Sequence, residues 1–352
     1  MSGSDVAVIG GGIIGSAIAW RLARSGWRVT VYDREEPGMA SKVAAGLLAP
    51  VTEAGSGEPD LADLMVASAR MWPSFAAELN EFAEVAYRPY GTILVGVEPD
   101  DEDRVDRYDA FYRQAGLETT RWTGEECRSA EPLLGDRVAS GLYAPGDHRV
   151  DPRKVLSALI IAGSAVGVER VVTQVADPAD LPCDRVILAA GCWSGRWGRL
   201  PVRPVPGQVV RLRSGGQATG LRRCVRAINR GRSVYLVPRD DGEVVVGASS
   251  REPGYDTSVM AGETAALLTD AIAVVPELAG YRLIETNVGL RPGTPDNGPL
   301  LGPIADGRLI AATGHYRNGV LMAPVTAELV ARYLADGVVP PAMARFAADR
   351  FS

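Results

Sequence analysis

The feature that most constrains the fold is the run V6-A-V-I-G-G-G-I-I-G15, followed by Asp33 at the end of V29-T-V-Y-D. This order predicts a short strand, a glycine turn, a helix, and a second strand closed by an acid. Gly10 permits the tight turn, Gly12 lets the backbone approach a pyrophosphate, and Gly15 lets the helix pack closely on the sheet. The helix N-terminus would face the phosphates, and Asp33 would accept a hydrogen bond from a ribose hydroxyl. The opening therefore predicts a Rossmann-like dinucleotide site, although glycines also mark ordinary turns.

Size and charge narrow the class of protein. A chain of 352 residues exceeds one hydrophobic core, so we expect one large or two interleaved domains. The net charge of −6 offers no broad basic surface and argues against nucleic-acid and membrane partners. We interpret a local group of arginines as a solvated face or a subunit contact. The group comprises Arg222, Arg223, Arg226, Arg230 and Arg232.

The sequence also bears on localisation and on metals. No stretch reaches the roughly 20 apolar residues that a membrane-spanning helix requires, so a cytoplasmic protein is expected. The two histidines, His148 and His315, have no metal-spaced partner, and the four cysteines lack CxxC spacing. We therefore predict no metal site and no Ser-His triad, and expect the chemistry to belong to a bound cofactor.

Hydrophobic periodicity outlines the other elements. It predicts one helix over 61–86, or two that break near Pro73, and a helix that starts at Asp151-Pro152. Buried strands are predicted over 168–175 and 184–194. Three alternating runs predict an antiparallel sheet rather than further βαβ units. These runs are 208–213, 233–238 and 243–247.

The dinucleotide fold thus begins at residue 1, leaves, and returns twice. We expect an FAD- or NAD-type dinucleotide-binding domain in three pieces, with an antiparallel substrate-binding domain inserted between them. The first domain is assigned to 1–80, 142–203 and 285–352, and the second to 81–141 and 204–284. Such an interleaved arrangement is more typical of flavoprotein oxidoreductases than of simple NAD dehydrogenases.

Six blocks of sequence together carry a resemblance that spans nearly the whole chain. They are the GGGIIG opening, ASKVAAGLLAP at 40–50, DHRVDP at 147–152, PVPGQ at 204–208, GLRPGTP at 289–295 and GHYRNGVLMAP at 314–324. The chain resembles the D-amino-acid oxidase superfamily, and within it the glycine oxidases of thiamine biosynthesis. The resemblance implies an α/β fold (α+β overall) of the D-amino-acid oxidase/glutathione-reductase-2 type, with a non-covalent FAD.

The resemblance also implies an activity. Glycine, and by extension sarcosine or small D-amino acids, would be oxidised with O2 to glyoxylate (through the imine), ammonia and H2O2. The imine would supply thiazole formation, with a thiazole synthase as a further partner, and the family implies a homotetramer. No protein acid or base is expected in the reaction.

Three residues are predicted to position the substrate. By resemblance, Arg291 holds the amino-acid carboxylate with two parallel hydrogen bonds, and the hydroxyl of Tyr235 reaches the same carboxylate. Arg317 matches a second arginine near the substrate. From sequence alone, a surface ion pair is the plainer interpretation of Arg291, and a buried core tyrosine is the alternative for Tyr235. Ser250 is included as substrate-binding.

The predicted cofactor-binding residues come from the glycine turn, the 40–47 segment and the 315–321 block. They are Gly10, Gly12, Ile13, Ile14, Gly15, Asp33, Arg34, Ala40, Ser41, Ala45, Gly46, Leu47, Val172, Gly191, His315, Tyr316, Arg317, Asn318, Gly319, Val320 and Leu321. The family's best-studied type has methionine where Leu47 and Ser250 stand and histidine where Ser233 stands, which leaves the substrate preference open.

Three alternatives stay open. Another small-amine flavoenzyme, such as a sarcosine oxidase or a D-amino-acid dehydrogenase, would share these blocks. Monomeric sarcosine oxidases carry their flavin on a C-terminal cysteine, and the sequence has none after Cys224. A non-catalytic FAD-binding module would not need the two arginines and the tyrosine together. An NAD-dependent dehydrogenase would not explain the blocks at 40–50 and 314–324.

Overall fold

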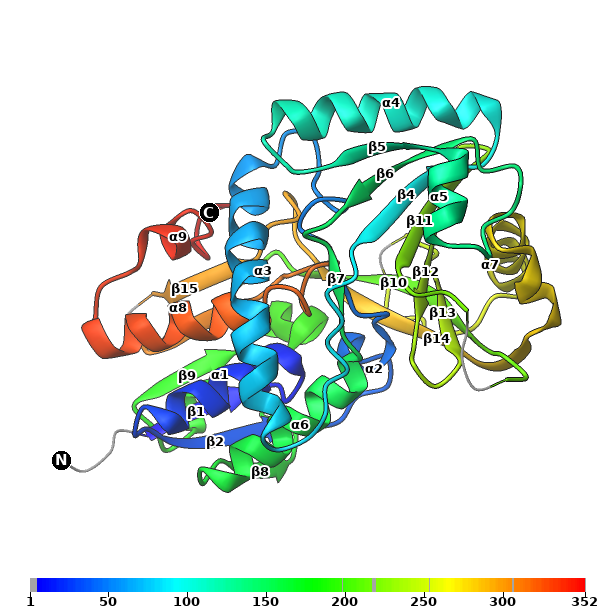
Figure 1. Cartoon of the computed structure of the whole chain (residues 1–352). Coiled ribbons are helices and arrows are strands. Elements are labelled where there is room, and N and C mark those ends of the chain that lie inside the picture. Colours follow the sequence, from blue (N-terminus) through cyan, green and yellow to red (C-terminus); the bar gives the residue numbers. More distant parts are fainter. Residues whose placement is uncertain (1–4, 198, 217–219, 253, 306, 352) are drawn as a thin grey trace.

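The computed structural model describes residues 5–197, 199–216, 220–252, 254–305 and 307–351. Two large sheets form its frame, joined by segments that cross between them several times (Figure 1). A further two-stranded sheet, β3 (Leu47–Leu48) with β7 (His148–Arg149), lies between the two.

The first sheet has six strands and is parallel except where β15 pairs with β16. In spatial order its strands are β15 (Leu300–Ile304), β16 (Leu309–Thr313), β9 (Arg185–Leu188), β1 (Asp5–Ile9), β2 (Arg28–Asp33) and β8 (Glu169–Val172). Apolar runs such as V186-I-L in β9 are buried because helices or loops cover both faces of a parallel sheet. The prediction of a buried strand is wrong for β8, which lies at the sheet edge with all four residues exposed.

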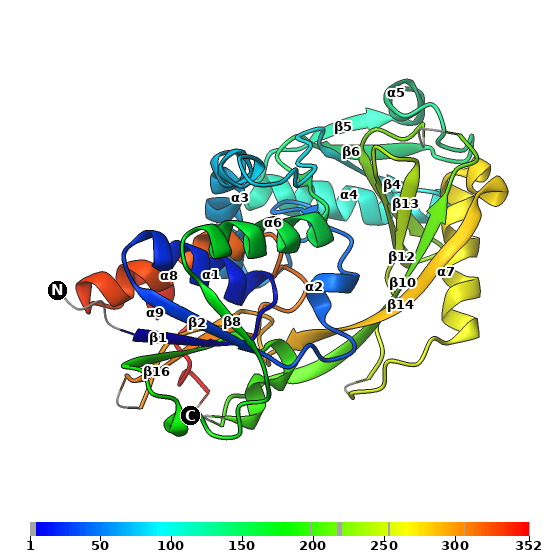
Figure 2. The ribbon, with the colours of Figure 1, turned by 90° about the horizontal axis from the view of Figure 1, so that it is seen from below.

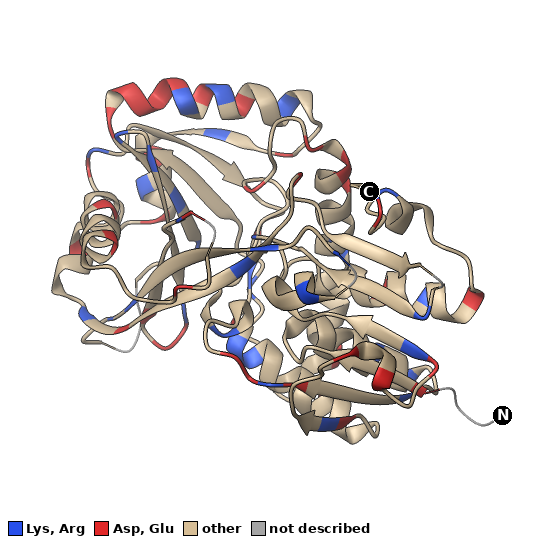
Figure 3. Cartoon of the chain, turned by 180° about the vertical axis from the view of Figure 1, so that it is seen from behind, with Lys and Arg blue, Asp and Glu red and all other residues tan. Residues whose placement is uncertain are grey.

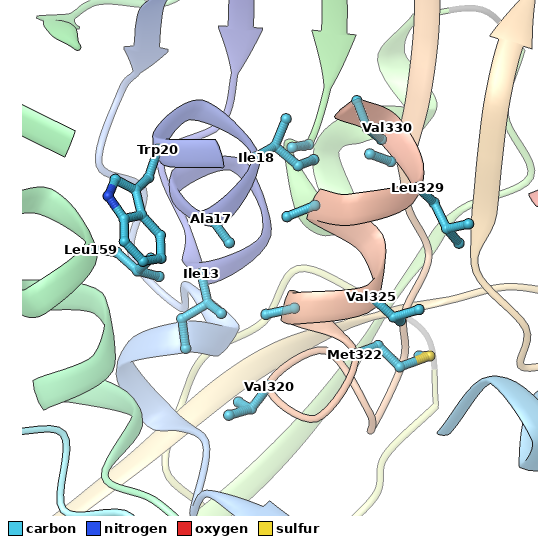
Figure 4. Close-up of a cluster of buried hydrophobic side chains, with 14 of the residues drawn as sticks. Ile13, Ala17, Ile18, Trp20, Leu159, Val320, Met322, Val325, Leu329 and Val330 are labelled. Carbon is cyan, nitrogen blue, oxygen red and sulfur yellow. The ribbon is translucent and has the colours of Figure 1, made fainter. Parts of the chain in front are cut away.

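Helices α1 (Ile13–Arg24), α6 (Pro152–Ala165) and α8 (Ala323–Asp336) lie side by side on one face of this sheet (Figure 2). Apolar side chains of α1, including Ile13, Ala17 and Ile18, belong to the same buried cluster as those of α8 (Figure 4). The predicted start of α6 is confirmed, since the Asp151 carboxylate accepts hydrogen bonds from the N–H groups of Arg153 and Lys154.

Helix α3 (Pro59–Asn80) covers α6 and α8 as an outer layer and is continuous through Pro73. A proline inside a helix removes one intrahelical hydrogen bond. The helix nevertheless continues because residues on both sides of Pro73, among them Leu64 and Leu79, are buried in the same core. Trp72 and Ser68 also donate hydrogen bonds, at 2.8 and 2.7 Å, to the carbonyl of Leu321.

The second sheet has eight strands, and it contains the three runs predicted as antiparallel. In spatial order they are β14 (Arg282–Gly293), β10 (Arg203–Arg213), β13 (Glu243–Gly247), β12 (Arg232–Pro238), β11 (Cys224–Asn229), β4 (Thr92–Gly96), β6 (Ser140–Ala144) and β5 (Thr120–Thr123). Neighbouring strands are antiparallel except for the parallel pair of β4 and β11. Strands β6 and β14 each cross a predicted domain boundary, at residues 142 and 285.

Two helices, α7 (Ala261–Val274) and α4 (Pro99–Gln114), cover the periphery of this sheet. Helix α7 buries its apolar side against β10, β12 and β13, whereas α4 lies over β4 and β6 and carries both acids and bases on its exposed side (Figure 3). The remaining helical segments are α2 (Ala40–Val43), α5 (Gly124–Ala130), α9 (Pro341–Ala344), η1 (Pro178–Asp180), η2 (Gly191–Arg196) and η3 (Pro276–Gly280). Within the described ranges, no helix has the length and apolarity to cross a bilayer.

We predict that Gly15→Ala destabilises the protein whereas Gly163→Ala does not. A Cβ at residue 15 would lie 1.9 Å from the Gly10 carbonyl oxygen, in backbone that cannot yield cheaply. The free energy of unfolding in urea should fall by about 1–3 kcal/mol. A Cβ at residue 163, in α6, would make only ordinary contact with Val168 at 3.5 Å, so this variant should gain up to about 1 kcal/mol of helix propensity. Equal unfolding midpoints for the two variants would contradict this packing.

Candidate active site

A cavity lies where the two sheets meet. One end is formed by the β1–α1 turn and the carboxyl end of β2, and the other by β10, β12 and β14. The segments 40–47 and 315–320 line the space between these ends. This is the edge of the parallel sheet at which open α/β folds bind their ligands.

The β1–α1 turn packs closely against the start of the loop that follows β9. Gly10 has a φ of +107°, and a Cβ there would lie 2.4 Å from the carbonyl oxygen of Ala189. Helix α1 starts immediately after Gly12, and the N–H groups of Gly12 and Ile14 have no hydrogen-bond acceptor among the described residues. The turn therefore presents free donors at a helix N-terminus, which is the arrangement that binds a phosphate.

Asp33 and Ser41 fix the two sides of this turn. Asp33 accepts a hydrogen bond from the N–H of Gly11 at 2.6 Å, and its carboxylate lines the cavity. The hydroxyl oxygen of Ser41 accepts from the N–H of Ile13 at 3.0 Å. Ser41 thus occupies one donor of the helix terminus itself and keeps its own O–H available.

The end of the cavity beyond Asp33 contains groups that the sequence did not single out. Trp193 and Trp197 line it, and the Arg34 guanidinium lies 5.9 Å from the Trp193 ring centre. Both tryptophans follow the carboxyl end of β9, where parallel-sheet sites are found, so their position after the glycine turn was a usable signal. The prediction that Val172 lies at the cofactor is not matched by its position. Its side chain is 73% exposed on the edge strand β8, and the cavity wall is formed by the next three residues, 173–175.

The segment 40–47 brings backbone into the middle of the cavity. Ala40, Ser41, Ala45 and Leu47 all line it. Gly46 has a φ of +88°, and a Cβ there would lie 2.2 Å from the carbonyl oxygen of Val150, so only glycine fits between the two chains.

The buried guanidinium of Arg239, from the end of β12, donates a hydrogen bond to the Ala45 carbonyl at 2.5 Å. This arginine lies 3.6 Å from the carboxylate of Asp151, the residue that caps α6. Arg239 therefore joins the second sheet to the segment that lines the cavity. The sequence did not identify this residue.

The turn at 315–322 supplies the opposite wall. Tyr316 has a φ of +46° and donates its N–H to the carbonyl of Pro292 at 3.0 Å. The N–H groups of Gly319 and Val320, which line the cavity, have no acceptor among the described residues. Leu321, predicted at the cofactor, is instead buried behind the wall, where its carbonyl accepts from α3. The wall thus offers free N–H donors just before α8, as the helix-start argument predicts.

His315 is buried and uncharged. Burial lowers the pKa of its imidazole to about 3, and its Nε2 lies 3.0 Å from the hydroxyl of Thr326 in α8. The imidazole is therefore neutral at physiological pH and is occupied in a structural hydrogen bond. Its role is to hold the turn against α8 rather than to carry charge.

Arg291 reaches the other end of the cavity from β14. Its Nη1 donates to the carbonyl of Ser249 at 3.2 Å, and no carboxylate of the described residues pairs with it. The guanidinium occupies the space that a side chain on Gly207 would need, since a Cβ there would lie 2.0 Å from Nη1. Gly207 of the PVPGQ block thus leaves the space that Arg291 occupies. The sequence did not reveal this role of the block.

Tyr235 and Arg317 lie at the same end. A Cβ on Gly247 would lie 2.3 Å from the Tyr235 hydroxyl, so this ring also depends on a facing glycine. Burial raises the pKa of Tyr235, which keeps the hydroxyl protonated as a donor. The guanidinium of Arg317 lies 5.0 Å from the ring centre of Tyr316. The structure therefore brings Arg291, Tyr235 and Arg317 to one cavity.

Two further charged residues line this end. Arg226 was interpreted from sequence as part of a solvated or subunit face, and this is wrong. It projects from β11 into the cavity and forms an ion pair with Glu53, which the sequence did not single out either. Side chains alternate between the two faces of a strand, so Arg226 lies on the face of β11 that borders the cavity. The charge pattern of the arginine cluster did not reveal which face this would be.

Ser250 and Gly15 do not line the cavity. At the Ser250 position the wall is formed by the two preceding residues, Ala248 and Ser249, after which the chain turns away to pair with the β10 backbone. Gly15 contributes through packing, as described above. The other residues predicted at the cofactor all line the cavity, including Gly191.

These groups suit FAD. The glycine turn leaves the N–H groups of Gly12 and Ile14 free at a helix N-terminus, Asp33 supplies an acceptor for a ribose, and the 315–320 wall supplies N–H donors for an electron-rich ring edge. Among the described residues no three metal-ligating side chains come together.

Comparison with known proteins agrees with this geometry. Residues 5–333 match the family model DAO, described as FAD dependent oxidoreductase. The crystal structure of glycine oxidase from Geobacillus kaustophilus superposes with a TM-score of 0.89 at 31% identity, covering 99% of this chain and 98% of that one. The hydrogen cyanide synthase subunit HcnC of Pseudomonas aeruginosa is 31% identical over 99% of this chain and 96% of its own length.

The bifunctional protein ThiO/ThiG of Synechocystis sp. is 35% identical over 99% of this chain. The chain spans only about half the length of that relative, 54%.

The fold and the site thus define an FAD-dependent oxidoreductase. The chain belongs to the DAO family, and the predicted fold class and cofactor are confirmed.

We predict that His315 contributes to the pH dependence of stability. Because its pKa is lower in the folded protein, the unfolded chain binds the extra proton below about pH 6.5, so stability falls as the pH drops below this value. At pH 5 the loss should be about 2 kcal/mol relative to pH 7.5. His315→Asn should remove this part of the slope in urea unfolding curves at the two pH values. An unchanged slope would show that the imidazole is not buried uncharged.

We also predict that Gly207→Ala displaces Arg291. The new Cβ would overlap the guanidinium, a side-chain end that can move, so FAD should stay bound while carboxylate binding weakens. If one charge-assisted hydrogen bond is lost, the Kd of a carboxylate ligand should rise roughly tenfold. The measurement is a titration followed by the visible absorption of the bound flavin. Gly216→Ala, with no atom within 4 Å of the added Cβ, is the matched control and should bind as the wild type does.

Proposed function

We propose that this protein oxidises the Cα–N bond of glycine, with small secondary or D-amino acids as further substrates. Glycine, O2 and water would give glyoxylate, ammonia and H2O2, with the imine as the first product. The similarity to glycine oxidase from Geobacillus kaustophilus over nearly the whole of both chains supports this substrate class.

One observation carries the proposal: Arg291 faces the cavity without a carboxylate partner from the described residues. Removing the charge of an arginine from water costs free energy unless a partner of opposite charge, such as a ligand, compensates it. Its planar fork matches a carboxylate, and the protonated hydroxyl of Tyr235 at the same end is suited to a further hydrogen bond. We therefore assign the substrate carboxylate to Arg291 and Tyr235.

We assign the cofactor along the rest of the cavity. Gly10, Gly12 and Asp33 would hold the adenosine diphosphate half, and the 40–47 segment and the 315–320 wall would hold the flavin half. When bound, FAD supplies the oxidant, taking two electrons from the substrate and passing them to O2.

The chain's own part is to hold the substrate by its carboxylate, so that the α-carbon is presented in one orientation. The cavity N–H groups of Gly319 and Val320 stabilise negative charge beside them. No basic side chain is required, because the substrate amine reacts in its deprotonated form and His315 is occupied by Thr326.

The proposal extends to the pathway. Similarity to the bifunctional ThiO/ThiG relative supports a role in thiamine biosynthesis, in which a thiazole synthase would take up the imine. The homotetramer and the cytoplasmic location stay predictions, as does the division at 1–80, 142–203 and 285–352.

Arg291→Ala tests the assignment. Removing charge-assisted hydrogen bonds worth about 1.5–3 kcal/mol each should lower kcat/KM for glycine at least roughly tenfold, with FAD retained. Peroxide formation would be measured with glycine, sarcosine, D-alanine and D-proline, and Arg291→Lys should recover only part of the loss.

The surface variant Arg21→Ala, which breaks an ion pair between α1 and α8, is the control and should turn over glycine normally. Wild-type turnover by Arg291→Ala would refute the carboxylate assignment. A flavin that amino acids reduce without peroxide formation would instead indicate a dehydrogenase.

A further inference from the structure

Glu53 and Arg226 form an ion pair in the wall of the cavity. Both side chains line it, and each is only 16% exposed. Glu53 comes from the loop after the 40–47 segment, and Arg226 from the middle of β11. An ion pair so far removed from water is costly to assemble, and replacing such pairs by apolar residues is often neutral for stability. Its presence in the cavity therefore points to a role in ligand selection.

The pair lies at the substrate end. Arg226 stands directly opposite Tyr235 in the antiparallel pairing of β11 with β12, so the two side chains share a face of the sheet. The charges of Arg291, Glu53 and Arg226 all act on the pKa of the Tyr235 hydroxyl. The ion pair is thus a neighbour of the groups assigned to the substrate carboxylate.

The loop that carries Glu53 is fixed in place. The buried carboxylate of Asp147 accepts hydrogen bonds from the N–H groups of Val51 and Thr52, at 2.9 and 3.0 Å, and from the Thr52 hydroxyl at 2.5 Å. The N–H of Ala54 donates back to the Val51 carbonyl at 3.0 Å. Residues on both sides of Glu53 are therefore held, and its carboxylate stays directed at Arg226.

The three cavity arginines at this end differ in whether a carboxylate of the protein neutralises their charge. Arg291 and Arg317 have no carboxylate partner within the described part of the chain, whereas Arg226 is neutralised by Glu53. A ligand carboxylate bound at Arg291 meets a free cation. A second carboxylate that approached Arg226 would meet the Glu53 carboxylate as well, and like charges at short range are repelled.

We propose that Glu53 is a specificity-determining residue that neutralises Arg226, denies the cavity a second carboxylate site, and so restricts substrates to amino acids with one carboxylate. This inference rests on the proposed function only in placing the first carboxylate on Arg291. It predicts that the selectivity between mono- and dicarboxylates depends on the charge of the Glu53–Arg226 pair.

The test compares two ethers that lack an amine, so that binding is measured without turnover. Methoxyacetate carries one carboxylate and diglycolate two. Each is titrated into the FAD-loaded protein, and Kd is taken from the change in visible flavin absorption. In Glu53→Gln the freed Arg226 should shift the ratio of the two Kd values at least about tenfold towards diglycolate, the worth of one charge-assisted hydrogen bond.

Two further variants give opposite and neutral results. Arg226→Gln leaves Glu53 unpaired and should shift the ratio away from diglycolate by a similar factor. The double variant Glu53→Gln/Arg226→Gln removes both charges and should return close to the wild-type ratio. Glu328→Gln, which breaks the surface pair with Arg21, is the matched control and should leave the ratio unchanged.

An activity arm uses sarcosine and iminodiacetate, which differ by the same carboxylate. Glu53→Gln should raise kcat/KM for iminodiacetate relative to sarcosine. A Kd ratio in Glu53→Gln within twofold of the wild type would overturn the inference. If Glu53→Gln does not retain FAD, Arg226→Gln decides, and an unshifted ratio there overturns it equally. A shifted Kd ratio in a protein that does not oxidise glycine would uphold the inference while refuting the proposed function.

Discussion

The cavity depends on the contact between the two sheets, which backbone atoms and buried arginines make together. Arg239 reaches from the second sheet to the carbonyl of Ala45, in the segment that borders the cavity. On the neighbouring edge, Leu290 donates its N–H to the Gly38 carbonyl at 2.9 Å, and a Cβ on Gly289 would lie 2.9 Å from Val43. These contacts tie β14, which carries Arg291, to the glycine-rich segment on the opposite side. The distance between the two ends of the site is therefore set by glycine positions and by one buried guanidinium.

Glycines act in pairs with the functional side chains throughout this site. Gly207 leaves the space that Arg291 occupies, and Gly247 leaves the space for Tyr235. Both glycines lie in strands, where glycine usually weakens the structure because it has no side chain to pack. A larger residue at either position would overlap a side chain that lines the cavity. The cavity also has a uniform electrostatic preference, because its free N–H groups and its arginines without a carboxylate partner among the described residues all favour a negatively charged ligand.

The sequence predicted those elements whose signals are local. The glycine turn with its helix and closing acid, and the start of α6 at Asp151, depend on residues within a few positions of each other. The family blocks predicted the cofactor and the fold for the same reason, because each block is a contiguous segment. The burial of β8 was mispredicted because Val171 and Val172 have the composition of a core strand while the strand lies at an edge. Edge position is a property of the whole sheet and leaves no mark on a four-residue run.

By itself, the sequence determined the dinucleotide turn and the family, and it singled out Arg291, Arg317 and Tyr235, which line the cavity. The tertiary structure alone decided which other charges join them. Glu53 and Arg226 are 173 residues apart in sequence, and one of them sits in a cluster of arginines that resembles any solvated face. Only the pairing of β11 with β12 and the fixing of the Glu53 loop by Asp147 bring this pair to the cavity. The physical reason is that charge and burial are set by long-range packing, whereas turns and caps are set by neighbours along the chain.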